Sequence, residues 1–404
     1  MEKLSSIAHY VTDKTSSNNI SLKEYVTTDC LLQNKKGREC ATNLPPQPCS
    51  LTHYKPNDVL VANIRPYLKK IWYADMEGGA SSDVLVFRAK EGHSPEYLYA
   101  LLLQDSFFDY VMQGTKGSKM PRGDKSQIMR YKVPTPKTTE KSIGSFFLNL
   151  SKKIRLNEQI NRNLEALAKQ LYDYWFVQFD FPDENGRPYK SSGGKMVWNE
   201  KLNRRIPERW HCGNLFEIAS FTNGIACQKF RPKQGEASLP VIKIKEMHDG
   251  ITADTELVTS QIPESVKVYN GDVLFSWSAS LEVMLWAFGA GGLNQHIFKV
   301  TSANGFPKSF YYFQLLDYVD VFKKMAEARK TTMGHITQDH LQQSTIAIPN
   351  DVSIAKSFEN MVSPIFDRII KLQEENSQLK KQREELLPLL MNGQVAVNSD
   401  LSLG

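Results

Sequence analysis

Residues 140–181 read EKSIGSFFLNLSKKIRLNEQINRNLEALAKQLYDYWFVQFDF, and this stretch decides how the rest of the chain is organised. Apolar residues that recur every three or four positions lie on one face of a helix, as they do in a coiled coil. A straight helix over residues 140–177 would be about 55 Å long at ~1.5 Å per residue. Turn-forming residues at 181–188 predict where it ends. The mostly apolar stripe on this helix consists of Leu150, Ile154, Asn157, Asn161, Leu164, Ala168, Leu171 and Trp175.

A matching stripe follows roughly 215 positions later in the chain. It consists of Ile365, Ile369, Leu372, Asn376, Leu379, Arg383, Leu386 and Leu390. Because a long one-sided helix is marginal alone in water, we predict that the two stripes bury each other as a coiled coil. The alternative is two unrelated surface helices. The seam asparagines would set the register, and Arg383, standing where the first helix has Ala168, predicts a weaker or partly wet seam.

Length and composition indicate a folded protein with more than one domain. The chain has 404 residues, of which 41% are hydrophobic and 23% charged. The net charge of +6 permits an anionic partner. Five cysteines without a Cys-x-x-Cys pair favour free thiols in a reducing compartment, so we expect a cytoplasmic protein. No apolar run is long enough to span a membrane or to form a signal peptide.

Two mixed regions alternate with the two helices. We predict a first globule at 1–136, a helix at 137–181, a connector at 182–206, a second globule at 207–350, a helix at 351–393 and a tail at 394–404. Strands are predicted at 59–62, 71–73, 84–87, 241–244 and 273–275, and helices at 94–111 and 307–325. Ser363-Pro364 predicts a restart or a kink in the last helix. Short matches between the globules, such as NDVL at 57–60 and GDVL at 271–274, predict one shared architecture.

No sequence motif indicates catalysis. The chain lacks the Asp/Asn-Pro-Pro-aromatic turn that holds a flipped base and the Gly-Lys-Ser/Thr end of a phosphate loop. It also lacks the Glu-x-Lys of paired-carboxylate nucleases and a His pair at metal-ligand spacing. The glycine-rich run at 289–292 is read as a turn. The sequence therefore predicts a binding and assembly protein that itself holds no metal or cofactor.

Residues 114–132, GTKGSKMPRGDKSQIMRYK, form a basic segment that fits a nucleic-acid contact. Its small residues let the backbone approach phosphate groups. Polar residues after two equivalent strands have side chains suited to reading base edges. The alternative is a solvated loop without a partner. The candidate contacts are Asn63, Arg65, Lys116, Lys119, Arg122 and Lys125 in the first globule, and Ser276, Ser278, Arg329, Lys330 and His335 in the second.

Three stretches carry a family resemblance. NEQINRNLEALA at 157–168, followed by LYDYWFVQFDF at 171–181, resembles the central region of specificity subunits of type I restriction–modification enzymes. IPERW at 206–210 resembles the opening of their second target-recognition domain, and LLPLLMNG at 386–393 resembles their closing helix.

The resemblance implies an α+β protein with two α/β target-recognition globules joined by two long helices that form an antiparallel coiled coil. Each globule would read one half of a split site on double-stranded DNA, and the helices would set the spacer. They would also dock methyltransferase subunits, of which two are expected, and a restriction subunit could join. S-adenosylmethionine, ATP and Mg²⁺ would then bind to the partner subunits. Two other hypotheses are a stand-alone methyltransferase or nuclease with divergent motifs, and a coiled-coil scaffold without DNA contact.

Overall fold

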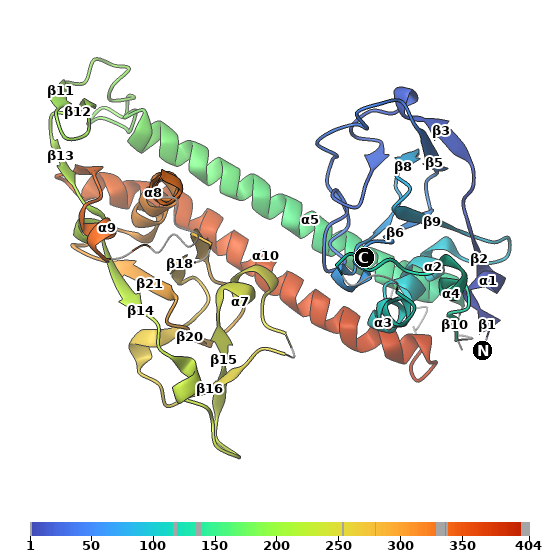
Figure 1. Ribbon diagram of the computed structural model, residues 1–404. Helices are drawn as coiled ribbons and strands as arrows, with labels where there is room; N and C mark the ends of the chain where they lie inside the picture. The colour runs from blue at the N-terminus through green and yellow to red at the C-terminus, as the bar shows by residue number, and fades with distance from the viewer. Residues whose placement is uncertain are drawn as a thin grey trace. The chain divides into compact units, whose positions relative to one another are not determined.

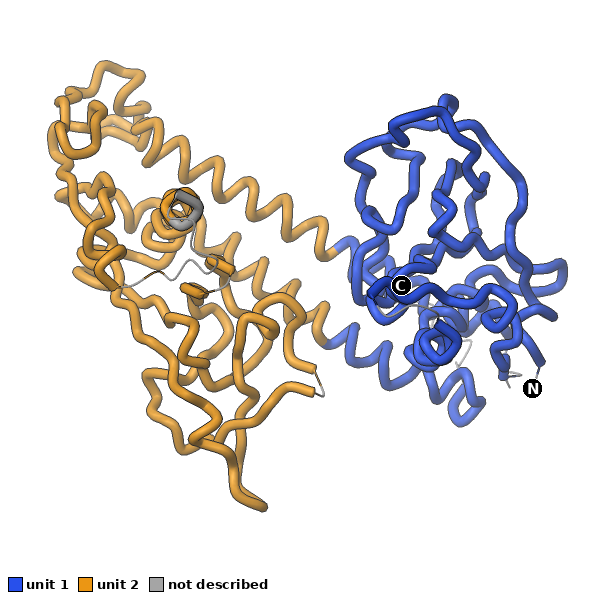
Figure 2. The backbone as a smooth tube through the Cα atoms, viewed as in Figure 1, with its two compact units in different colours: residues 1–156, 378–404 blue, residues 157–377 orange. Residues whose placement is uncertain are grey.

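The computed structural model describes residues 2–115, 119–134, 139–252, 254–278, 280–328, 336 and 338–396, except for the side chains of residues 326–328. The chain divides into two compact units, coloured separately in Figure 2. Unit 1 comprises residues 1–156 and 378–404, and unit 2 comprises residues 157–377. Each unit therefore contains part of both long helices, α5 (Glu140–Tyr172) and α10 (Ser353–Met391).

Unit 1 contains two four-stranded sheets, a two-stranded sheet of β1 and β10, and short helices beside its parts of the two long helices. One sheet has the strand order β2-β9-β6-β7 and is antiparallel throughout, and the other has the order β3-β5-β8-β4. The elements are β1 (Glu2–Lys3), α1 (Leu4–Ile7), β2 (Ala8–Tyr10), β3 (Lys14–Ser16), β4 (Tyr25–Val26), β5 (Ser50–Tyr54), β6 (Val59–Ala62), η2 (Pro66–Leu68), β7 (Ile71–Tyr73), β8 (Gly78–Ala80), β9 (Val84–Ala89), α2 (Pro95–Leu102), α3 (Asp105–Gln113), α4 (Lys125–Ile128) and β10 (Lys132–Val133). The strands predicted at 59–62, 71–73 and 84–87 are confirmed.

Unit 2 repeats this arrangement with different residues (Figure 1). Its antiparallel sheet has the order β14-β21-β18-β19, and its second sheet has the order β16-β15-β20-β17. In both units a short helix leads directly into the first sheet, and a central strand of the second sheet has one parallel and one antiparallel neighbour. The predicted common architecture of the globules is thus confirmed.

The elements of unit 2 follow the same chain order. They are the π-helical segment η3 (Asp173–Val177), β11 (Met196–Asn199), β12 (Arg204–Pro207), β13 (Trp210–Gly213), α6 (Leu215–Ile218), β14 (Ala219–Asn223), β15 (Ser238–Ile242), α7 (Ile244–Asp249), β16 (Leu257–Thr259), β17 (Lys267–Val268), β18 (Val273–Ser276), β19 (Glu282–Leu285), β20 (Gly291–Leu293), β21 (Ile297–Ser302), α8 (Lys308–Ala328), α9 (Gln338–Gln342) and β22 (Ile346–Pro349). Short 3-10 turns complete the two units: η1 (Ser17–Asn19), η4 (Cys227–Lys229) and η5 (Glu264–Val266).

Four predictions of local structure were wrong in whole or in part. The strand predicted at 241–244 ends at Ile242, and Ile244 begins α7. The helix predicted at 94–111 is divided into α2 and α3 because Gln104 adopts an extended conformation and starts a new helix at Asp105. Gly291 and Gly292 lie in strand β20, where Gly292 pairs with neighbours on both sides, rather than in a turn. Helix α10 continues through Ser363-Pro364, so the predicted restart is wrong, while the kink that was its alternative stays a prediction.

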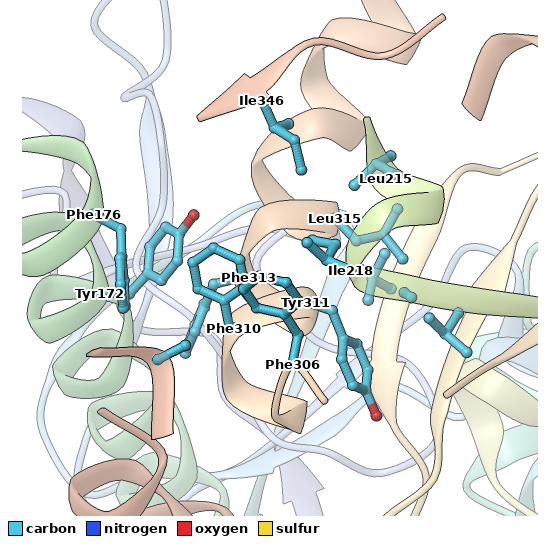
Figure 3. Close-up of a cluster of buried hydrophobic side chains, with 14 of the residues drawn as sticks. Tyr172, Phe176, Leu215, Ile218, Phe306, Phe310, Tyr311, Phe313, Leu315 and Ile346 are labelled. Atoms are coloured by element: carbon cyan, nitrogen blue, oxygen red, sulfur yellow. The ribbon is translucent and has the colours of Figure 1, made fainter. Parts of the chain in front are cut away.

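The core of unit 2 joins both long helices to the sheet. Tyr172 and Phe176 come from the end of the first long helix and face the aromatic residues of α8, as Figure 3 shows. The ring centroids of Phe176 and Phe310 are 5.0 Å apart, as are those of Tyr172 and Phe313. Phe358 of α10 lies 5.0 Å from Phe176 in the same cluster. The aromatic residues that end the first long helix therefore anchor it in a globule.

Candidate nucleic-acid interface

In unit 1, the end of strand β6 and the basic segment lie together although they are about 60 residues apart in sequence. Ile64 and Arg122 form an isolated antiparallel bridge. The backbone N–H of Arg65 donates to the carbonyl of Pro121 across 2.8 Å. The two stretches that the sequence predicted separately as DNA contacts therefore form one continuous surface.

The Asn63 side chain lies beneath this surface. It is only 7% exposed, and its Oδ1 has no hydrogen-bond partner among the described residues. A Cβ atom on Gly123 would lie 2.8 Å from that oxygen, so glycine allows the loop to close over Asn63. The backbone carbonyl of Asn63 accepts from the Gly123 N–H across 3.1 Å, so the loop is bound to the Asn63 backbone and not to its side chain.

Arg65 begins a tight turn, residues 65–69, in which both end residues have left-handed backbone conformations. Arg65 has φ 50° and ψ 59°, and Lys69 has φ 51° and ψ 47°. Tyr67, between them, is 49% exposed. The sequence analysis did not select Tyr67, although an aromatic residue two positions from an arginine is a usual signal of nucleic-acid contact.

The basic segment presents its charges to solvent. Arg122 forms an ion pair with Asp83 at 2.9 Å while its side chain stays 58% exposed, and Lys119 and Lys125 are exposed. The segment's acid, Asp124, accepts from two backbone N–H groups at the start of α4 and so caps that helix. The local field thus remains positive. Lys116 lies outside the described residues.

The corresponding place in unit 2 has the same backbone connection. The N–H of Ile336 donates to the carbonyl of Trp277 across 3.0 Å, as the N–H of Gly123 does to Asn63 in unit 1. Trp277 itself donates from Nε1 to Asn223. Sequence reasoning did not select Trp277, although SWS at 276–278 contains it. The shared connection makes this the second candidate surface.

The serines of this second surface are less accessible than expected. Ser276 is fully buried, and its hydroxyl donates to the carbonyls of Ser278 and Ser280. In this conformation Ser276 therefore shapes the loop and does not face a ligand. Ser278 is 6% exposed. The other predicted contacts of unit 2, Arg329, Lys330 and His335, lie outside the described residues.

The two long helices contact each other inside each unit. In unit 2, the Asn157 Nδ2 donates to Asn376 Oδ1 across 3.0 Å, and the Asn161 Nδ2 reaches the carbonyl of Ile369 at 3.4 Å. In unit 1, Leu150 and Leu386 pack against one hydrophobic cluster. Residues early in α5 thus meet residues late in α10, so the pair is antiparallel. The predicted interface residues that are buried or half-buried are Leu150, Ile154, Asn161, Leu164, Leu171, Trp175, Ile369, Leu372, Asn376, Leu379 and Leu386.

Burial of Arg383 contradicts a partly wet seam at this position, whereas the weaker seam that was its alternative stays a prediction. The Arg383 side chain is buried, with 5% of the residue exposed, and it forms an ion pair with Glu384 at 3.0 Å. The long apolar part of the arginine side chain can pack in the seam while the guanidinium pairs with the carboxylate of Glu384.

Neither a metal centre nor a membrane span is found in the part of the chain that the structure describes. Those residues contain no group of three or more His, Cys, Asp or Glu side chains that could hold a metal ion. Their helices are also too polar or too short to cross a bilayer. The fold thus comprises two modules of one architecture, each with a candidate surface.

Comparison with known proteins finds a family match in the first part of the chain. Residues 8–166 match the type I restriction modification DNA specificity domain. This match and the relatives below make the chain similar to specificity subunits of type I restriction–modification enzymes.

Similar proteins span nearly the whole chain. The MjaIX specificity subunit of Methanocaldococcus jannaschii is 24% identical over 378 residues, covering 90% of this chain and 83% of its own length. The HindI specificity subunit of Haemophilus influenzae is 22% identical, covering 84% and 87%. The S subunit crystal structure from M. genitalium has a TM-score of 0.58 at 12% identity, covering 98% of this chain and 96% of its own, and so shares the fold.

Proposed function

We propose that each unit carries one target-recognition module, and that each module reads one half of a bipartite site on double-stranded DNA. The observation that carries this proposal is the repeated backbone connection, Asn63 to Gly123 in unit 1 and Trp277 to Ile336 in unit 2. The same connection presents different side chains in each unit. Two modules of one architecture with different surfaces suit a site whose halves differ in sequence.

The basic segment supplies the sequence-independent part of this binding. Exposed lysines and arginines neutralise phosphates and release counterions, which gives affinity and fixes the register of the protein on the duplex. The 65–69 turn adds Arg65 and the exposed Tyr67 beside them. We assign direct base reading to this turn, because a guanidinium can bond a guanine edge through two donors.

The helix pair sets the length of the unread spacer and docks methyltransferase subunits. Docking is supported by apolar side chains that α5 and its π-helical end leave exposed in unit 2. Leu167 is 45% exposed and Tyr174 is 38% exposed, whereas the seam residue Ala168 is fully buried. We place S-adenosylmethionine, ATP and Mg²⁺ on the methyltransferase and restriction subunits. We place the two recognition modules at residues 1–136 and 207–350, the limits that the sequence predicts.

The first experiment tests recognition. The chain is co-expressed with a methyltransferase subunit of a type I system, and methylated adenines are mapped across the genome with and without it. We expect methylation at one bipartite sequence that requires this chain. Methyl transfer to DNA by the purified chain alone would instead support the stand-alone enzyme, and absence of any sequence preference would support the scaffold.

The second experiment tests the spacer. Removing one heptad from each helix, residues 158–164 and 369–375, shortens the pair by about 10 Å and keeps the seam in phase. We expect the spacer to shorten by about three base pairs, given ~3.4 Å per base pair, while both half-sites stay the same. The control is Arg162→Ala, which changes the same heptad without changing its length. An unchanged spacer in the shortened protein contradicts the measuring role.

A further inference from the structure

Lys35 is a buried cation at the centre of unit 1. Its side chain is only 4% exposed. The ammonium lies 2.9 Å from Asp105 at the start of α3 and 3.0 Å from Glu384 of α10. A buried ammonium is unfavourable unless it is paired, and breaking such a pair by removing one partner is strongly destabilising. The position of this cation is therefore firmly determined by two helices.

The backbone at Lys35 is bound to the turn that carries Arg65. The N–H of Lys35 donates to the carbonyl of Lys69 across 2.9 Å, and the N–H of Asn34 donates to Leu68 across 2.9 Å. Asn34 and Lys35 have φ values of 56° and 61°, a left-handed conformation that only nearby packing maintains. The segment is thus shaped to lie against the 65–69 turn.

Asp105 completes the connection. Its carboxylate lies 2.8 Å from the ammonium of Lys69, the last residue of the turn, as well as 2.9 Å from Lys35. Burial acts to raise the pKa of Asp105, but the two ammonium groups outweigh it and lower the pKa. The carboxylate therefore stays charged and holds both lysines.

We propose that Lys35 is a positioning residue for DNA recognition by unit 1. It fastens the 65–69 turn to α3 and to the C-terminal part of α10, so that Arg65 and Tyr67 are presented in one fixed conformation. The connection to Glu384 links this turn to a helix of the pair that we assign to methyltransferase docking. This inference rests on the proposed function, since it names a residue that determines how accurately one half-site is read.

The test measures how well the complex distinguishes each half-site from a mutated one. Arg65→Ala in the complex with the methyltransferase first identifies the half-site that unit 1 reads. We then expect Lys35→Met to reduce discrimination at that half-site about tenfold, an effect as large as that of one mismatched base pair. Discrimination at the other half-site should not change. The matched control is Lys36→Met at the neighbouring lysine, which should leave discrimination at both half-sites unchanged.

A second pair of variants separates positioning from folding. Glu384→Gln removes the charge that pairs with both Lys35 and Arg383 but keeps a side chain of the same size, which is 42% exposed in Glu384, so unit 1 should still fold. This variant should also reduce discrimination at the half-site that unit 1 reads, but by less than Lys35→Met does. Lys35→Arg keeps the charge and should restore part of the discrimination. The proposal is overturned if discrimination falls equally at both half-sites. It is also overturned if neither Lys35→Met nor Glu384→Gln reduces discrimination. If the unmodified complex lacks bipartite binding, the proposed function fails instead.

Discussion

Asn157 and Asn376 meet in the buried seam of the helix pair, where Nδ2 of Asn157 donates to Oδ1 of Asn376 across 3.0 Å. Asn157 is fully buried and Asn376 is 5% exposed. The same Asn157 amide donates to Glu375 Oε2 at 2.7 Å, so both of its hydrogens are used. A shift by one seam position would place the buried Asn157 amide against Leu372 or Leu379. The pair therefore selects one register out of several that apolar residues alone would permit.

Replacing one member of this pair should destabilise unit 2. Asn376→Leu leaves the Asn157 amide facing an apolar side chain, and we expect a loss of about 1–3 kcal/mol in the free energy of unfolding. The double variant Asn157→Leu/Asn376→Leu should recover much of that loss, because two apolar groups then face each other. Urea denaturation of the four proteins in the cycle measures this coupling. Additive losses would show that the two amides act independently.

Removing an aromatic anchor of the first long helix should cost more. Phe176 is 1% exposed and packs against Phe310 and Phe358. We expect Phe176→Ala to lower the free energy of unfolding by about 3–5 kcal/mol, because it leaves a cavity in the core. Tyr174→Ala, two residues away at an exposed side chain, should stay within about 0.5 kcal/mol. Equal effects of the two changes in thermal or urea unfolding would contradict the packing of this core.

Lys119→Ala should weaken DNA binding in a salt-dependent way. If Lys119 neutralises one phosphate, its removal lowers the slope of log affinity against log salt by about 0.9. The loss should be similar for specific and unrelated duplexes, because phosphates carry no sequence information. Fluorescence anisotropy at several salt concentrations provides the measurement. Lys141→Ala, an exposed lysine at the start of α5, is the control, and an unchanged slope in Lys119→Ala places the basic segment away from DNA.

The Asp105 cluster should make the stability of unit 1 depend on pH. The pKa of Asp105 is lowered in the folded protein from 3.8, because the ammonium groups of Lys35 and Lys69 outweigh the effect of burial. A carboxyl of this kind stabilises the fold above its unfolded pKa, and the stabilisation is lost as pH falls through the folded pKa. We expect stability to fall below about pH 4, and Asp105→Asn to reduce that fall while being less stable at neutral pH. Urea unfolding between pH 3 and 7 tests this. If the free energy of unfolding falls with pH equally in the unmodified protein and in Asp105→Asn, the Asp105 cluster does not cause the pH dependence.

The sequence predicted the candidate surfaces more successfully as segments than as side chains. The basic segment and the residues after β6 were identified from charge and turn composition, and they do lie together. The sequence did not show which individual side chains of these segments are buried. Ser276 and Asn63 are polar residues at strand ends, where they would normally face solvent, yet each is covered by its own loop. Lys35 was not selected because a single lysine in a loop gives no signal that carboxylates 70 and 349 positions later will surround it.

The repeat also has an asymmetry that only contacts reveal. Aligning the two stripes matches Asn161 with Asn376 and Asn157 with Leu372. A symmetric pair of helices that joins Asn157 to Asn376 would also place Asn161 opposite Leu372. Because leucine offers no acceptor there, the Asn161 amide turns to the carbonyl of Ile369 at 3.4 Å. The two halves of the seam are therefore different although their stripes correspond.

By itself, the sequence determined the two helices, several strands and the repetition of one architecture, because helical and strand periodicity and turn residues act over a few neighbours. Tertiary structure alone decided which distant segments meet: Ile64 with Arg122, Asn157 with Asn376, and Lys35 with Asp105 and Glu384. Such contacts depend on the closing of long loops and on the burial of whole surfaces, which no local pattern records.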